Sequence, residues 1–118
     1  MKQEIKEKWV EALRSGEYSQ TTGVLRDDIG FCCLGVLCDL HQKETGEGEW
    51  LQPKINKRIY YLDGSGVRDS GVLTPKVMEW AGLDMDNFII DGDSGYAAII
   101  NDNGATFAYI ADLIEKNL

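Results

Sequence analysis

The chain has 118 residues and a mass of 13.2 kDa, which fits one domain of ordinary size. Hydrophobic residues make up 43% and charged residues 27%, a composition that excludes a disordered or collagen-like protein. The 12 basic and 20 acidic residues leave a formal charge of −8, which disfavours non-specific binding to nucleic acid or to anionic membranes.

The first predicted element is an amphipathic helix over residues 3–15, because apolar residues recur at helical spacing and Gly16 follows as a stop signal. A hairpin is predicted next, in which the apolar pieces VLR and FCC flank the turn sequence DDIG. The apolar period then changes to that of a helix. Residues 33–44 are therefore predicted to form a mostly buried helix that ends at Gly46.

Residues 45–57 are polar and contain glycine and proline, so they are predicted to form a loop. Its expected anchors are Trp50, Leu51 and Ile55. The segment RIYYL at 58–62 is rich in β-forming residues and predicts a strand, which ends in a turn at DGSG.

A short helix is predicted after Thr74, which suits the N-cap position, with Pro75 at the first helical position and Gly82 as the stop. Further on, segments 87–90 and 96–100 flank the turn sequence DGDSG and predict a second hairpin.

The closing helix is predicted over residues 107–117, with Thr106 as its cap, because the apolar residues there share one face. Helices at both termini and strands between them predict an α+β fold. We expect a single small domain, residues 1–118, in which a buried central helix packs on a short antiparallel sheet.

No apolar stretch reaches the roughly 20 residues that cross a bilayer. The N-terminus MKQEIKEKWV mixes charges and lacks the apolar core of a secretory signal. The cysteines number three and lie within seven positions, which does not suit a disulfide framework. We therefore expect a reduced protein of the cytoplasm with no membrane partner.

Cys32, Cys33, Cys38 and His41 form a cluster of residue types that can bind metals. No C-x-x-C pair is present and the neighbours are apolar or glycine, so core packing is the preferred interpretation and no metal or other cofactor is predicted. The alternative is a nucleophilic pair of Cys38 and His41, in which the imidazole lowers the pKa of the thiol. No third, orienting group is indicated.

Two further patterns are not interpreted as sites. The sequence DGDSG at 91–95 opens like a calcium loop, but Tyr96 stands where that loop needs glycine, so a plain turn is predicted. The capped C-terminal helix suits the first part of a helix-turn-helix, but its surroundings are acidic and no recognition helix follows. Common catalytic motifs are absent, so neither nucleic-acid binding nor catalysis is predicted.

The segment from Arg14 to Arg26 is unusually polar for a connection between two predicted elements. Arginine beside aromatic and amide side chains is suited to binding a phosphate or a planar ring. In the alternative, purely structural interpretation, Arg14 caps a helix, Tyr18 packs on the core edge and Arg26 points to solvent. Asn101, Asp102 and Asn103 beside Gly104 are a second candidate, although they equally suit a turn before a helix. The predicted ligand-binding residues are Arg14, Tyr18, Gln20, Thr21, Arg26, Asn101 and Asn103.

Several stretches together carry a resemblance to a known family: WVEALRSGEYSQTTGVLR, FCCLGVLCDL, LTPKVMEWAGL and NDNGATFAYIADLIEKN. The sequence resembles a family of small, mostly uncharacterised proteins from phages, prophages and some bacteria that share a W-x-x-A-L-R-S-G-x-Y segment and a C-C-L-G-V-L-C-D-L box. The resemblance implies a biological context and no catalytic residues. Small phage-type proteins often act by binding, for instance by sequestering a host immune signal or inhibiting a host protein.

We therefore expect a non-enzymatic binding protein that captures a small, nucleotide-derived signalling ligand, with a homo-oligomer left open. One alternative is an acidic protein that blocks a basic surface of a host protein, suggested by the charge of −8 and by Asp27, Asp28, Asp91 and Asp93. The other alternative is an enzyme built on Cys38 or His41. If the protein is phage-encoded, its expected compartment is the cytoplasm of the host cell.

Overall fold

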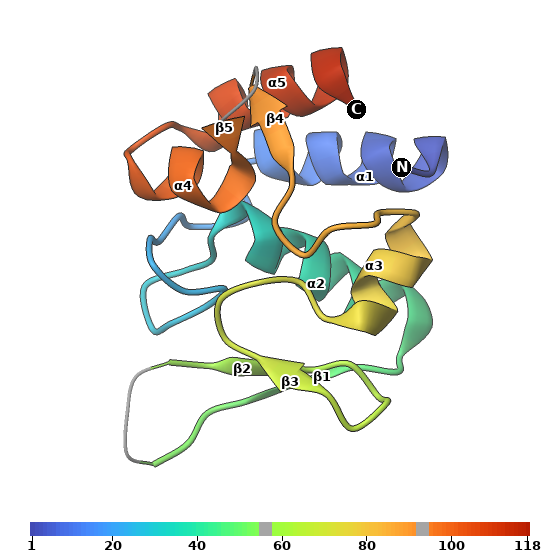
Figure 1. Ribbon diagram of the computed structural model, residues 1–118. Coiled ribbons are helices and arrows are strands. Elements are labelled where there is room, and N and C mark those ends of the chain that lie inside the picture. Colours follow the sequence, from blue (N-terminus) through green and yellow to red (C-terminus); the bar gives the residue numbers. More distant parts are fainter. Residues whose placement is uncertain (55–57, 92–94) are drawn as a thin grey trace.

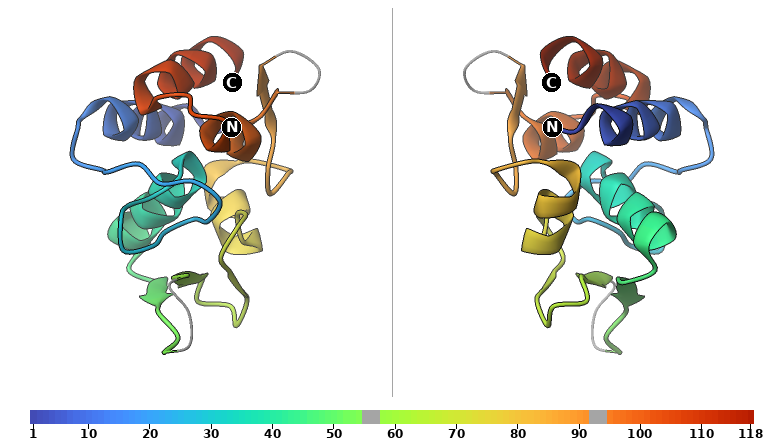
Figure 2. Two further views of the ribbon diagram at one scale, coloured as in Figure 1. Left: turned by 90° about the vertical axis from the view of Figure 1, so that its left-hand side faces the viewer. Right: turned by 90° about the vertical axis from the view of Figure 1, so that its right-hand side faces the viewer.

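The computed structural model describes residues 1–54, 58–91 and 95–118. These residues contain five helices and five short strands (Figure 1). In chain order the elements are α1 (Gln3–Arg14), α2 (Cys33–Thr45), β1 (Glu49–Leu51), β2 (Tyr60–Leu62), β3 (Arg68–Asp69), α3 (Pro75–Ala81), β4 (Ile89–Asp91), β5 (Gly95–Tyr96), α4 (Ala97–Asp102) and α5 (Phe107–Asn117). Helices α1 and α5 lie side by side at one end, α2 and α3 occupy the middle, and β1–β3 lie at the other end (Figures 1 and 2).

The predicted α+β fold is confirmed, with helices at both termini and a central helix. Helix α1 buries one face through Ile5, Trp9, Val10 and Leu13, as its apolar spacing predicts. Helix α2 differs because eight of its 13 residues are buried, so neighbours cover it on most sides. Helix α5 begins and ends at the predicted residues.

The N-terminal turn of α2 holds two other parts of the chain close to it. Gly35 packs so tightly against the backbone of Leu25 that an added Cβ would overlap the Leu25 carbonyl. The indole Nε1 of Trp9, on α1, donates a hydrogen bond of 3.0 Å to the carbonyl of Cys33. Helix α2 is capped by the Sγ of Cys32, which accepts from the Gly35 N–H.

Strands β1, β2 and β3 form an antiparallel sheet in which β2 is central. Because side chains alternate along a strand, Trp50 and Tyr61, which are paired across β1 and β2, face the same way. This is the inner face of the sheet, since Tyr61 is fully buried against His41 of α2. The outer face carries the alternate residues.

The loop predicted over 45–57 is wrong in part, because β1 forms within it. Trp50 was expected only as an anchor, but it pairs in register with Tyr61, a partner 11 residues further along the chain. Local composition does not show such a pairing. Ile55, the third predicted anchor, lies outside the described residues.

The two predicted hairpins differ from the observed chain path. In the first, VLR and FCC make isolated bridges and a turn in which the Asp27 N–H donates to the Gly30 carbonyl, but no regular strands. In the second, β4 pairs with β5 as predicted, but residues 97–100 belong to α4 and not to a strand. The side chain of Asn87 accepts from the Ala98 N–H and so favours the start of that helix. The turn predicted at 91–95 lies largely outside the described residues.

Helix α3 begins at Pro75 as predicted, but its cap comes from elsewhere. Thr74 occupies the N-cap position without a side-chain cap hydrogen bond. Instead Asp63, a buried residue just after β2, accepts a hydrogen bond of 3.2 Å from the N–H of Lys76. The same carboxylate accepts from the backbone and the hydroxyl of Ser65. Burial acts to raise the pKa of Asp63, but these hydrogen bonds outweigh it and lower the pKa.

We expect Asp63→Ala to lower the free energy of unfolding by about 1–2 kcal/mol, because it leaves the N-terminus of α3 without its acceptor. Since the folded pKa of Asp63 lies below the unfolded one, its ionised form stabilises the fold above about pH 4 and that contribution is lost as the pH falls further. Urea denaturation at neutral and acidic pH measures both effects.

Asp28→Ala is the matched control, since Asp28 is the same residue type at an exposed position. It should leave stability near wild type. Equal losses in the two variants would contradict the capping role of Asp63.

Candidate functional site

Arg26 lies against half-buried aromatic rings between α2 and the sheet. Its guanidinium carbon is 4.6 Å from the centroid of the Phe31 ring and 5.3 Å from that of Trp50. Tyr18 meets Phe31 edge to face with centroids 5.0 Å apart, and Phe31 meets Trp50 at 5.8 Å. We call Tyr18, Arg26, Phe31 and Trp50 the Arg26 cluster. Cation–π and edge-to-face contacts are both favourable, so these four side chains hold one another in place.

A buried carboxylate holds two side chains of the Arg26 cluster by hydrogen bonds. Asp39, on α2, is 7% exposed and accepts hydrogen bonds from the Tyr18 hydroxyl at 2.6 Å and from the Trp50 indole at 3.1 Å. Lys43, one turn along the helix, pairs with the same carboxylate at 3.1 Å. Burial and the hydrogen bond to Asp39 raise the pKa of Tyr18, so its hydroxyl stays a donor.

The aromatic contacts continue from the Arg26 cluster into the core. Trp50 packs on Tyr61 with centroids 4.8 Å apart, and Tyr61 in turn contacts His41, whose ring contacts Trp80 of α3. Tyr61 and His41 are buried, whereas Trp50 and Trp80 at the two ends of this row are half-buried. The cluster therefore rests on a packed interior.

Gln20, Thr21 and Asn101 lie together, but their polar groups bond one another. Gln20 donates from Nε2 to the Oδ1 of Asn101 at 2.9 Å, and Asn101 donates from Nδ2 to the Thr21 carbonyl at 2.8 Å. The Oδ1 of Asn101 also accepts from the N–H of Cys33, at the start of α2. Asn101 is fully buried. These residues join the loop after α1 to α2 and α4. The Thr21 hydroxyl donates a hydrogen bond to the carboxylate of Asp27.

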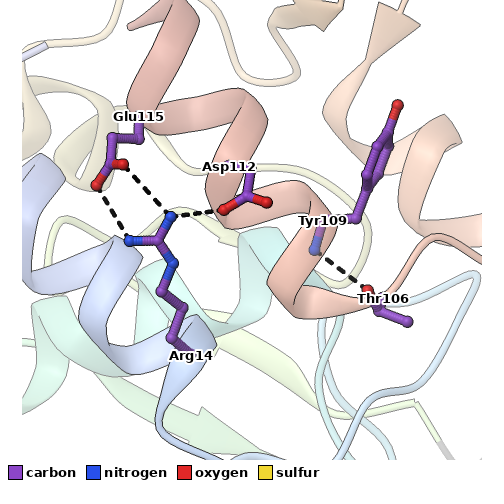
Figure 3. Close-up of polar contacts among 5 residues, drawn as sticks. All are labelled: Arg14, Thr106, Tyr109, Asp112 and Glu115. Carbon is purple, nitrogen blue, oxygen red and sulfur yellow. Dashed lines mark hydrogen bonds and ion pairs between the residues drawn. The ribbon is translucent and has the colours of Figure 1, made fainter.

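Arg14 lies apart from the Arg26 cluster, with which it shares no hydrogen-bond or ion-pair partner among residues 1–54, 58–91 and 95–118. It reaches from α1 to two carboxylates of α5, Asp112 at 2.6 Å and Glu115 at 3.1 Å (Figure 3). Hydrogen bonds to Glu115 and Asp112 raise the pKa of its guanidinium. Arg14 also lines a surface groove of about 660 Å³ between α1 and α5, with Gln3, Lys6, Glu7, Val10, Glu11, Ser15 and Glu115. The segment from Arg14 to Arg26 thus does not form one site.

Asn103 is exposed at the C-terminal end of α4, where its backbone N–H donates to the Ile99 carbonyl. Asp27, part of the predicted acidic surface, is occupied within its own turn, since its carboxylate accepts from the N–H groups of Ile29 and Gly30. Of the predicted binding residues, the structure therefore brings only Tyr18 and Arg26 together with open aromatic surface.

The cysteines lie in the core. All three are free and buried, and burial raises the pKa of the Cys32 thiol to about 11 and those of Cys33 and Cys38 well above the usual value. The Nδ1 of His41 hydrogen-bonds the Tyr61 hydroxyl at 2.6 Å, and burial lowers the pKa of this histidine. A thiol with a raised pKa is a poor nucleophile. The geometry favours the packing interpretation over a Cys38 and His41 pair.

Phe31, Trp50, Asp39 and Lys43 belong to the site, but sequence reasoning did not assign them to it. The spacing of Asp39 and Lys43, i and i+4 on a predicted helix, was an available signal for their ion pair. Nothing local indicates that Trp50 meets Phe31, because the two are joined only by tertiary packing.

Within the described ranges, no group of three or more His, Cys, Asp or Glu residues could hold a metal ion. Within the same ranges, none of the helices has the length and apolar character needed to cross a membrane.

The fold and the Arg26 cluster together define a small α+β domain with a fixed cationic and aromatic surface. The chain belongs to a family described as a domain of unknown function, DUF8296, which matches residues 1–118. No curated protein and no solved structure matches it.

The role of Asn101 can be separated from that of its exposed neighbour. We expect Asn101→Ala to lower the free energy of unfolding by about 2–4 kcal/mol, because it leaves buried donors and acceptors unpaired. Asn103→Ala removes the same kind of side chain two residues away and should change stability by less than about 0.5 kcal/mol. Thermal and urea unfolding of both variants test this, and a similar loss for both would contradict it.

Burial of the thiols predicts slow alkylation of the native protein. We expect all three cysteines to resist iodoacetamide at neutral pH and to react fully in denaturant, as read by mass spectrometry. Rapid modification of Cys38 in the native protein, with the other two unreacted, would instead support an activated thiol.

Proposed function

We propose that the protein is a non-enzymatic binding protein whose ligand, a small nucleotide-derived molecule, contacts the Arg26 cluster. The observation that carries this proposal is the placement of Arg26 over Phe31 and Trp50. A planar guanidinium beside aromatic rings suits a ligand that combines a phosphate with a planar base.

Arg26 is better suited to an anionic ligand than Arg14. In the described part of the chain, no carboxylate forms an ion pair with Arg26, whereas Arg14 is bound by two. The N–H groups of Arg26 therefore remain as donors for a phosphate. Lys43 lies 5.1 Å from the centroid of the Tyr18 ring, but its charge is paired with Asp39, so Arg26 is the cation that the cluster offers to an anionic ligand.

The rings supply the other half of the recognition. Trp50 and Phe31 are half-buried, so each keeps surface on which a base can stack. Asp39 holds Tyr18 and Trp50 by hydrogen bonds, which lowers the entropy cost of ordering them around a ligand. The overall charge of −8 opposes a phosphate at long range, but salt screens that field beyond about 8 Å.

The resemblance to small proteins of phages and prophages supports a biological setting for this binding. In that setting the ligand is a signal of the host's immune response, and the protein acts by sequestering it in the host cytoplasm. Capture needs no catalytic group, in keeping with the absence of common catalytic motifs from the sequence.

The first experiment is a pair of mass spectra of the freshly purified protein, native and denaturing, to weigh any co-purified molecule. Nucleotides and cyclic dinucleotides are then titrated by calorimetry. We expect Arg26→Ala to weaken binding by roughly 10- to 100-fold, because a charge-assisted hydrogen-bonding partner is lost. Arg26→Lys should restore part of it, since lysine keeps the charge but not the planar geometry.

Arg14→Ala is the matched control, because it removes one arginine whose partners lie on α5. It should bind as wild type does. Unchanged binding by Arg26→Ala would overturn the site, and a loss confined to Arg14→Ala would move it to the groove between α1 and α5. Failure of every nucleotide tested to bind the wild-type protein would overturn the ligand class.

A further inference from the structure

Within the described residues, the outer face of the three-stranded sheet is partly exposed. Because side chains alternate along the strands, this face carries Glu49 and Leu51 of β1, Tyr60 and Leu62 of β2, and Arg68 of β3. Leu51 is 42% exposed, and Tyr60 and Leu62 are half-buried. The sheet lies at one end of the molecule with α2 on its other side (Figures 1 and 2). An apolar strip thus faces outward.

Opposite charges flank this strip in one row across the sheet. Glu49 pairs in register with Leu62, and Leu62 pairs with Arg68, so the row reads Glu49, Leu62, Arg68 from one edge to the other. Neighbouring strands are about 4.8 Å apart, which places the two charged residues about 10 Å from each other. Within the described residues, neither side chain forms an ion pair, and Arg68 only lies over the ring of Tyr60, 5.5 Å from its centroid.

Such a row is complementary to itself under a twofold rotation. When two copies of the sheet face each other and the axis runs along β2, each edge strand lies over the opposite edge strand of the other copy. Glu49 then faces Arg68 of the second copy, twice, and Leu62 faces Leu62. Facing sheets pack about 10 Å apart, a gap that glutamate and arginine side chains bridge together.

We propose that a second copy of this chain docks on the outer face of the sheet, forming a twofold dimer held by two Glu49–Arg68 pairs around a Leu62 contact. The Arg26 cluster packs against the inner face, so this proposal does not depend on ligand binding. The face is small, because its strands contain two or three residues. A stable interface buries about 800 Å² on each partner, so we expect a weak dimer with a Kd near 0.1 mM.

Charge reversal tests the pairing directly. Glu49→Arg alone places two arginines opposite each other at both edges, and Arg68→Glu alone does the same with two carboxylates. Each variant should raise the dimer Kd by at least about tenfold, measured by sedimentation equilibrium at protein concentrations up to about 1 mM. Circular dichroism checks that both variants keep the fold.

The two variants mixed in equal amounts provide the decisive measurement. In the mixed dimer every edge again carries one positive and one negative charge, so association should return to the wild-type level, as it should in the double variant. Lys116→Glu, at an exposed position of α5, is the control for a changed net charge, and it should leave the Kd unchanged. A wild-type protein that stays monomeric at about 1 mM overturns the proposal. A dimer that neither variant weakens, or that mixing does not restore, overturns it as well.

Discussion

The close contact between Gly35 and the backbone of Leu25 is the constraint on which the rest of the structure depends. No side chain fits between them, so the chain before α2 lies directly on the first turn of that helix. Arg26 and Phe31 follow Leu25 within the same short turn, and Cys32 then caps the helix. The contact therefore decides two things together: how deeply α2 is buried, and where the arginine and the phenylalanine of the candidate site lie. A larger residue at position 35 would separate the turn from the helix and disperse the site with it.

Two buried polar side chains give this arrangement its specific geometry. Asn101 joins the loop after α1 to the start of α2, and Asp39 holds Tyr18 and Trp50 against the other side of the same helix. Buried polar groups are costly unless they are paired, so each of them strongly favours one position of the segments that it bonds. The aromatic surface around Arg26 is consequently ordered before any ligand arrives. Arg14 differs from Arg26, because its guanidinium forms ion pairs with two carboxylates and so joins α1 to α5 at the opposite end of the molecule.

Helices α1, α2, α3 and α5 were predictable because their signals are local. Apolar spacing and stop residues placed α1, α2 and α5 within a residue or two of their observed bounds, and Pro75 marked the start of α3. The strands were less predictable, because they depend on partners that are distant in the chain. Strand β1 was missed because Trp50 becomes part of a strand only by pairing with Tyr61, and residues 97–100 were assigned to a strand because their β-forming side chains outweighed a cap that comes from Asn87. Even the cap of α3 comes from Asp63, twelve residues before the helix begins.

The sequence by itself determined the class of fold, the amphipathic helices, the burial of the cysteines and the presence of a polar, arginine-bearing segment after the first helix. These follow from composition and from patterns within one turn or one strand, where neighbours in the chain are neighbours in space. Only the tertiary structure decided that Arg14 and Arg26 lie in different places with different partners. It also decided that Gln20, Thr21 and Asn101 are joined by hydrogen bonds. Finally, it brought Phe31 and Trp50 against Arg26. The reason is physical: an arginine pairs with whatever carboxylate or ring the fold brings to it, and those partners lie from 5 to more than 90 residues away in the chain.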